Sequence, residues 1–120
     1  MKPARPLAVA AILMLVASSA IAAEPAYVGT WGTNAAQCKI PQERQGAPMV
    51  FSAKGYDQHE AHCTFKSVKP TAGGWNIAAE CSVEGDQQKD AFSLKVVSGA
   101  LIMGHGRSTR KFVRCPSPRR

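Results

Sequence analysis

The 120-residue sequence has no Cys-x-x-Cys pair, no glycine-rich loop ahead of a helix, and no apolar run much longer than ten residues. The first absence argues against dithiol redox chemistry, and the second against a phosphate-binding loop. A membrane-spanning helix needs about 20 apolar residues, so the protein is not expected to be an integral membrane protein. Acidic residues are also few, with 8 Asp and Glu against 15 Lys and Arg.

The first 22 residues have the organisation of a secretion signal. Lys2 and Arg5 give a basic start, residues 7–16 form an apolar centre, and Ala20-Ile21-Ala22 has the small residues of a cleavage site. We predict cleavage after Ala22 or Ala23, and no nearby cysteine offers attachment to a lipid. The mature protein is therefore expected in the periplasm or outside the cell, where cysteines pair.

The mature chain has the length of one small domain. We predict a signal peptide at residues 1–22, a single β domain at 23–115 and a flexible basic tail at 116–120. A domain of about this size buries under roughly two-thirds of its extended surface, so cross-links would add to a modest core. The cysteines are Cys38, Cys63, Cys81 and Cys115. An even number in an exported chain indicates two disulfides, with three pairings possible in principle.

Alternation of apolar and polar residues predicts a hairpin that selects one pairing. Residues 75–84 nearly alternate, as do residues 61–66, and the Pro-Thr-Ala-Gly-Gly between them is a turn by composition. A register centred on this turn places Cys63 opposite Cys81 and matches apolar residues at the same time. We therefore predict a Cys63–Cys81 disulfide, which leaves Cys38–Cys115.

The fold class follows from the short strands into which the rest of the chain divides. Further strands are expected at residues 27–31, 49–52, 91–96, 100–103 and 109–115, giving an all-β antiparallel meander of about seven strands. Residues 34–37 are expected to form one helical turn, without a longer helix. Such a meander hides its edges in a closed barrel or a sandwich. A Cys38–Cys115 bridge brings the first and last strands together, which favours the barrel.

Gly29-Thr30-Trp31, in the first expected strand, resembles the Gly-x-Trp opening of lipocalins and related small secreted bacterial barrels. The resemblance implies a lipocalin-like barrel in which Trp31 packs beneath an arginine of the last strand. Arg110 and Arg114 are the candidates for this partner at the barrel floor. The alternative is that Trp31 is an ordinary core aromatic. Small bacterial inhibitors of secreted proteases share this barrel plan and size, so the resemblance also implies inhibition.

Positive charge is concentrated at the C-terminal end. Six basic residues lie in the last fourteen positions: Arg107, Arg110, Lys111, Arg114, Arg119 and Arg120. This end is expected either to contact an acidic protein or anionic surface, or to form a solvated strand face with a fraying tail. The basic strand carries no stacking platform for bases, so nucleic acid is not an expected partner.

Catalysis and cofactor binding find little support in the sequence. His59-Glu60-Ala61-His62 differs from a zinc motif because its histidines are three apart within an expected strand and point to opposite faces. The alternative is that Asp57, His59, His62 and His105 converge on a metal through folding. With all thiols paired, no cysteine nucleophile remains, and no serine lies in a nucleophile elbow. We expect no enzymatic activity, cofactor or metal.

The remaining class is a noncatalytic exported binding protein, expected to be a monomer. Its most concrete form is an inhibitor of a secreted or envelope hydrolase. The expected partner surfaces are the polar loop 39–47 with Arg44, the tip at 55–57 with Tyr56, and the tail with Arg119 and Arg120. The alternatives are a barrel that captures a small ligand or glycan, and an envelope interaction protein that uses its basic end.

Overall fold

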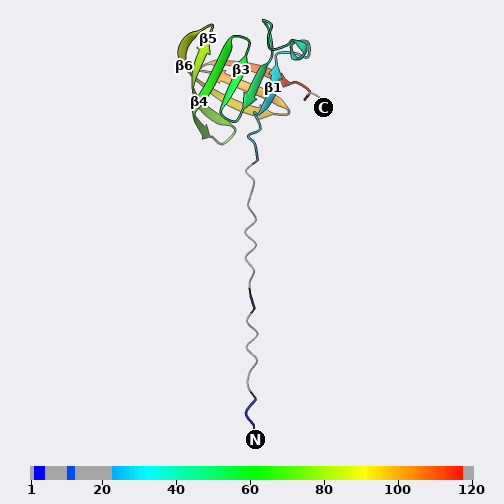
Figure 1. Cartoon of the computed structure of the whole chain (residues 1–120), viewed down its shortest axis with the longest axis vertical. Coiled ribbons are helices and arrows are strands. Elements are labelled where there is room, and N and C mark those ends of the chain that lie inside the picture. The colour runs from blue at the N-terminus through cyan, green and yellow to red at the C-terminus, as the bar shows by residue number, and fades with distance from the viewer. Residues whose placement is uncertain (1, 5–10, 13–22, 118–120) are drawn as a thin grey trace.

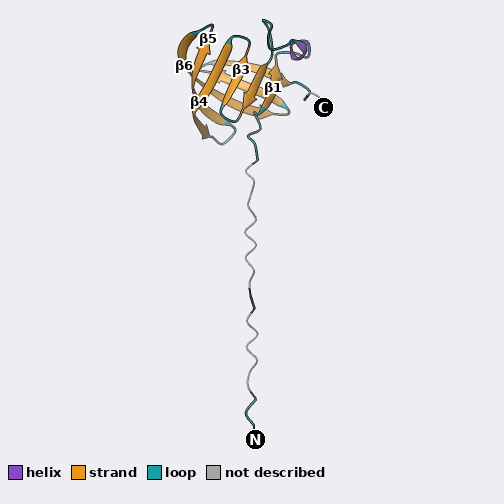
Figure 2. Cartoon of the chain, in the orientation of Figure 1, coloured by secondary structure: helices purple, strands orange, loops and turns teal. Residues whose placement is uncertain are grey.

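The chain folds into a closed antiparallel β-barrel of eight strands, seen in a computed structural model that describes residues 2–4, 11–12 and 23–117 (Figures 1 and 2). The predicted signal peptide falls mostly outside the described residues, as do Arg119 and Arg120. The elements are β1 (Gly29–Gly32), the 3-10 helix η1 (Gln37–Lys39), β2 (Met49–Ser52), β3 (Gly55–Gln58), β4 (Ala61–Pro70), β5 (Trp75–Val83), β6 (Asp86–Val97), β7 (Ala100–His105) and β8 (Ser108–Arg114). Within the described residues, none of the helices has the length and apolarity to cross a membrane.

Pairing of β1 with β8 closes the barrel. Trp31 lies opposite Arg114 in this ladder, and the backbone N–H of Cys115 donates to the Thr30 carbonyl at 2.8 Å. The Cys38–Cys115 disulfide then ties η1 to the end of β8, across a sequence separation of 77. This bridge, predicted as the pair that remains after Cys63–Cys81, is confirmed, and so is the closed barrel that it favoured.

The β4–β5 hairpin has the predicted register around its disulfide. Cys63 pairs with Cys81, and Phe65 with Ala79. A β-bulge at Lys66 then shifts the ladder by one residue. Because the bulge adds one residue to β4 alone, it keeps apolar side chains of both strands on the inner face beyond this point.

The structure has one strand more than the seven predicted, because residues 55–58 form β3 and not a loop tip. This strand is only four residues long, with a single apolar side chain, so alternation could not reveal it. Gly55 permits the pairing: a Cβ at this position would collide with the carbonyl oxygen of Cys63 on β4. The predicted turn at residues 55–57 is therefore corrected, and the chain reverses just before it, at Ala53 and Lys54.

Side chains of the barrel itself fill its interior. The largest side chains that are fully buried are Trp31, Tyr27, Phe51, Phe112, Leu94 and Leu101. Tyr27 precedes β1 and closes one end, where its ring meets Trp75 at 5.0 Å between centroids and its hydroxyl donates to the Ala53 carbonyl at 2.7 Å. We call this the closed end. The opposite end, formed by the β1–β2, β3–β4, β5–β6 and β7–β8 connections, is the open end.

Candidate functional site

Four polar side chains face inward near the open end, and we call them the mouth cluster: Tyr56, Asp90, His105 and Arg110. The alternation of side chains along each strand turns them inward, because each lies two residues from a buried core side chain on its own strand or pairs with one on a neighbouring strand. Arg110, for example, precedes the buried Phe112 by two residues and pairs with the buried Met103. The four residues come from β3, β6, β7 and β8, and all but the exposed Arg110 are partly buried.

The floor beneath the mouth cluster is aromatic. The Tyr56 and Phe92 rings are 6.1 Å apart, and the Phe92 and His105 rings are 5.5 Å apart. The Arg110 guanidinium carbon lies 4.9 Å from the centroid of the Phe112 ring, which is a cation–π distance. Charged and hydrogen-bonding groups therefore stand directly on a packed apolar core.

Electrostatic coupling links the members of the cluster across the barrel. Burial raises the pKa of Tyr56 above its usual value of 10.0, the Asp90 carboxylate raises the same pKa further, and the Arg110 guanidinium lowers it. Asp90 accepts from the His105 ring, with 3.3 Å between Oδ2 and Nε2. The Asp90 carboxylate on β6 and the Arg110 guanidinium on β8 thus both act on the phenol of Tyr56 on β3.

The long connection between β1 and β2, residues 33–48, also stands at the open end, and we call it the open-end loop (Figure 1). Its backbone is held by side chains. Gln37 donates from Nε2 to the Gly46 carbonyl at 3.0 Å, and Gln42 donates from Nε2 to the Pro48 carbonyl at 2.8 Å. A loop of sixteen residues with so little regular structure is commonly functional.

The open-end loop is also attached to the barrel wall. Gln58 at the end of β3 donates from Nε2 to the Ala47 carbonyl at 3.0 Å, and the His59 ring nitrogen Nδ1 lies 3.2 Å from the Gln42 carbonyl. The Cys38–Cys115 disulfide provides a third attachment. Arg44 is exposed between these attachments.

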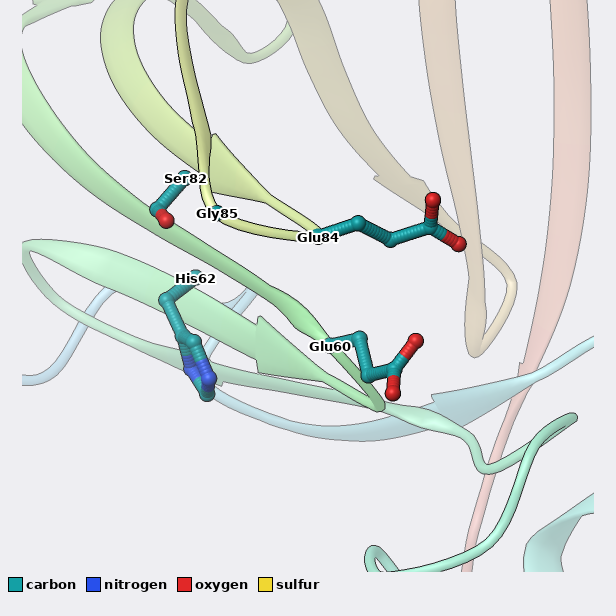
Figure 3. Close-up of a pocket in the computed structure, with 5 residues that line it drawn as sticks. All are labelled: Glu60, His62, Ser82, Glu84 and Gly85. Atoms are coloured by element: carbon teal, nitrogen blue, oxygen red, sulfur yellow. The ribbon is translucent and has the colours of Figure 1, made fainter.

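An open pocket of about 540 Å³ lies beside two of the hairpin tips that surround the mouth (Figure 3). Its lining residues are Glu60, His62, Ser82, Glu84 and Gly85. The tips are tied by a bond from the Glu84 N–H to the Glu60 carbonyl at 2.9 Å, and both glutamates extend to the same side. His62 is engaged with Asp57 at 2.8 Å. Among the described residues, no three acidic, histidine or cysteine side chains gather in a metal-binding arrangement.

A more apolar pocket of about 670 Å³ lies beside the Cys38–Cys115 disulfide. It is lined by Ala35, Cys38, Lys39, Val113, Arg114, Pro116 and Ser117. The Val113 side chain points outward here and is 39% exposed, so an apolar surface remains uncovered near the C-terminal end.

The two arginines proposed for the barrel floor have different surroundings. Arg114 lies over Trp31, with its guanidinium carbon 4.2 Å from the ring centroid. Its Nη1 and Nη2 donate to the carbonyls of Val28 at 3.1 Å and Ala26 at 2.9 Å, while the Trp31 indole N–H donates to Tyr27. Arg110 lies over a different ring and belongs to the mouth cluster. Of the two candidate arginines, Arg114 is therefore the one that packs against Trp31.

Other residues singled out in the sequence lie in different places. Tyr56 is not at a loop tip, because β3 turns its ring inward, where it packs 5.0 Å from Phe51. His62 faces the outside of the barrel, whereas His105 faces the mouth, so the histidines do not converge. The sequence analysis did not single out Asp90, and it considered His105 only as one member of a possible metal site. The signal that could have placed both at the mouth was alternation along their strands, because Asp90 lies two residues from the buried Phe92 and His105 two residues from the buried Met103.

Comparisons with models of known protein families, with curated proteins and with solved structures find no match for this chain. The geometry and chemistry of its side chains therefore carry the functional argument.

Proposed function

We propose that the protein is a noncatalytic exported binding protein that presents its open-end loop to a protein partner, most concretely as an inhibitor of an exported hydrolase. The observation that carries this proposal is the fixed conformation of the loop. Side-chain amides bond to its carbonyls, and the Cys38–Cys115 disulfide anchors it to the barrel. The two disulfides are consistent with an oxidising compartment outside the cytoplasm.

A loop that is ordered before binding favours recognition of a folded partner. Each flexible side chain that is immobilised on association costs about 0.5–1.5 kcal/mol, and a loop already held in place avoids much of that cost. Loops on rigid scaffolds commonly carry binding residues. The exposed Glu43, Arg44 and Gln45 lie near the tip of this loop and offer charge and hydrogen bonds to such a partner.

The interior of the barrel supports a protein partner better than an enclosed small ligand. Trp31, Phe51 and Leu94 are at most 1% exposed and occupy the space that such a ligand needs. Ligand-binding barrels depend on an interior that their own side chains leave open. Recognition at the outer surface and the rim does not need this space.

The test uses the mature protein as bait for proteins from the periplasm and culture fluid of its host, followed by assay of the captured proteins for hydrolase activity. Arg44→Glu is expected to weaken capture at least about tenfold, because it reverses a charge at the centre of the contact. Lys54→Glu makes the same charge change at an exposed turn of the closed end and is expected to leave capture unchanged. Equal effects of the two variants, or a mature protein that captures nothing, would contradict the proposal.

A further inference from the structure

Arg110 is a cation without an anionic partner in the described part of the chain. The ion pairs there join other residues, and the contact recorded for its guanidinium is the ring of Phe112. Its strand holds it at the mouth, above the buried Met103 and Phe112. One side of the Arg110 guanidinium therefore packs against the Phe112 ring, and its N–H donors are accessible from the solvent.

Tyr56 supplies a second unused donor on the opposite wall. Its ring is held by contacts with Phe51 at 5.0 Å and Phe92 at 6.1 Å, so the hydroxyl has a defined position. No side chain or carbonyl of the described residues is hydrogen-bonded to that hydroxyl. Tyr56 and Arg110 both stand on the aromatic side chains beneath the mouth, Tyr56 against Phe92 and Arg110 against Phe112. The positive charge of Arg110 also lowers the pKa of Tyr56.

The Asp90 carboxylate, which belongs to the same cluster, does not form an ion pair with Arg110. Asp90 Oδ1 accepts from the Ala91 N–H at 2.9 Å, and Oδ2 accepts from the His105 ring at 3.3 Å. Both oxygens are thus committed to other donors. The glutamates of the rim, Glu60 and Glu84, lie on the β3–β4 and β5–β6 tips and not on the β7–β8 side that carries Arg110.

We propose that the mouth cluster binds the carboxylate of an acidic side chain that a protein partner inserts at the open end. Arg110 makes the paired bonds to the two carboxylate oxygens, and the Tyr56 hydroxyl donates a further one. The buried Met103 and Phe112 fill the interior beneath Arg110, so a bound carboxylate would lie at the mouth and not inside the barrel, which fits a side chain that reaches in from outside. Arginine is well suited to this role because its fork matches carboxylate geometry.

The inference rests on the proposed function for the nature of the partner, but its test needs no partner. The mature protein, labelled for NMR, is titrated with the capped peptides acetyl-Gly-Glu-Gly-amide and acetyl-Gly-Gln-Gly-amide, and with acetate. The Glu peptide is expected to produce saturable shifts in the signals of Arg110, Tyr56 and His105. The Gln peptide has the same shape without the charge and is expected to produce none. Acetate is expected to shift the same signals with weaker affinity.

Three variants separate the site from general charge effects. Arg110→Gln is expected to weaken binding of the Glu peptide at least about tenfold, since charge-assisted paired bonds are lost. Tyr56→Phe keeps the packed ring and is expected to weaken binding about threefold or more. Lys111→Gln removes the same charge from the outer face of the same strand and is expected to bind normally.

Several results would overturn the inference. These are the absence of saturable shifts, equal binding of the Gln peptide, and equal weakening by Arg110→Gln and Lys111→Gln. Acetate binding as tight as the Glu peptide would overturn the assignment to a protein side chain. These titrations use no captured protein. They therefore test carboxylate binding at the mouth independently of recognition through the open-end loop.

Discussion

Replacement of Arg114 by alanine is expected to destabilise the barrel by about 2 kcal/mol. The guanidinium donates to two carbonyls of the segment before β1, and each such bond contributes about 1 kcal/mol net. The cation–π contact with Trp31, at 4.2 Å, adds about 0.5–1 kcal/mol. Because Arg114 is exposed, water takes over part of the hydrogen bonding to the carbonyls, which brings the total down to about 2 kcal/mol.

Urea unfolding of the chain from residue 23 onward, followed by tryptophan fluorescence, measures this loss. A domain of this size has an m-value of about 1 kcal/mol/M in urea, so the midpoint is expected to fall by about 2 M. Arg114→Met keeps an apolar cover over Trp31 and is expected to lose less than Arg114→Ala. Limited proteolysis within residues 23–28 gives a local readout, since those carbonyls lose their partner in both variants.

Arg110→Ala is the matched control for this experiment. Arg110 is also exposed and also lies over a ring, at 4.9 Å from Phe112, but it makes no backbone bond in the described part of the chain. Its loss is expected to cost about 0.5 kcal/mol. Equal losses for the two variants, or a change below about 0.5 kcal/mol for Arg114→Ala, would refute the assignment of Arg114 as the residue that fastens the closed end.

Three further predictions concern the disulfide, a turn and the tyrosines. Cys38→Ala with Cys115→Ala is expected to cost about 4.5 kcal/mol in urea unfolding, from the chain entropy of a separation of 77, and to speed hydrogen exchange in the open-end loop. Gly74→Ala is expected to destabilise the protein strongly, because its Cβ meets a β6 carbonyl, whereas Gly73→Ala has room and changes the midpoint little. Spectrophotometric titration is expected to place the ionisation of both tyrosines above pH 10, because burial raises their pKa values. The pKa of each tyrosine is higher in the folded than in the unfolded protein, so keeping the hydroxyls protonated favours the folded state. This contribution to the free energy of unfolding is fully present below pH 10 and is lost as the pH rises through the folded pKa.

The sequence predicts the parts of this fold in which local pattern and global pairing agree. In the β4–β5 hairpin, alternation, turn composition and thiol matching all select the same register, so Cys63–Cys81 could be predicted without a structure. In the short β3, no pattern of alternation, turn composition or cysteine spacing indicates a strand. Its identity as a strand depends on the approach of the β4 backbone to Gly55, which is a tertiary contact.

The candidate site was less accessible to sequence reasoning than the fold. Tyr56, Asp90, His105 and Arg110 are spread over four strands, and the length of one strand relative to the next decides whether they reach the same height in the barrel. The alternation of side chains along a strand shows which face of the sheet each residue occupies, but not which end of the barrel it lies near. The closing register between β1 and β8 supplies that information, and it becomes visible only when the barrel is assembled.

Arg110 and Arg114 show how the two ends of one barrel acquire different roles. They lie four residues apart on the same face of β8, and each guanidinium stands over an aromatic ring. At the closed end the segment before β1 passes close enough to offer two carbonyls, so Arg114 is used to hold the fold together. At the open end, no described residue accepts a hydrogen bond from the Arg110 guanidinium or forms an ion pair with it. The same side chain is therefore structural where the backbone satisfies it and available for recognition where the backbone does not, which is why we place binding at the open end.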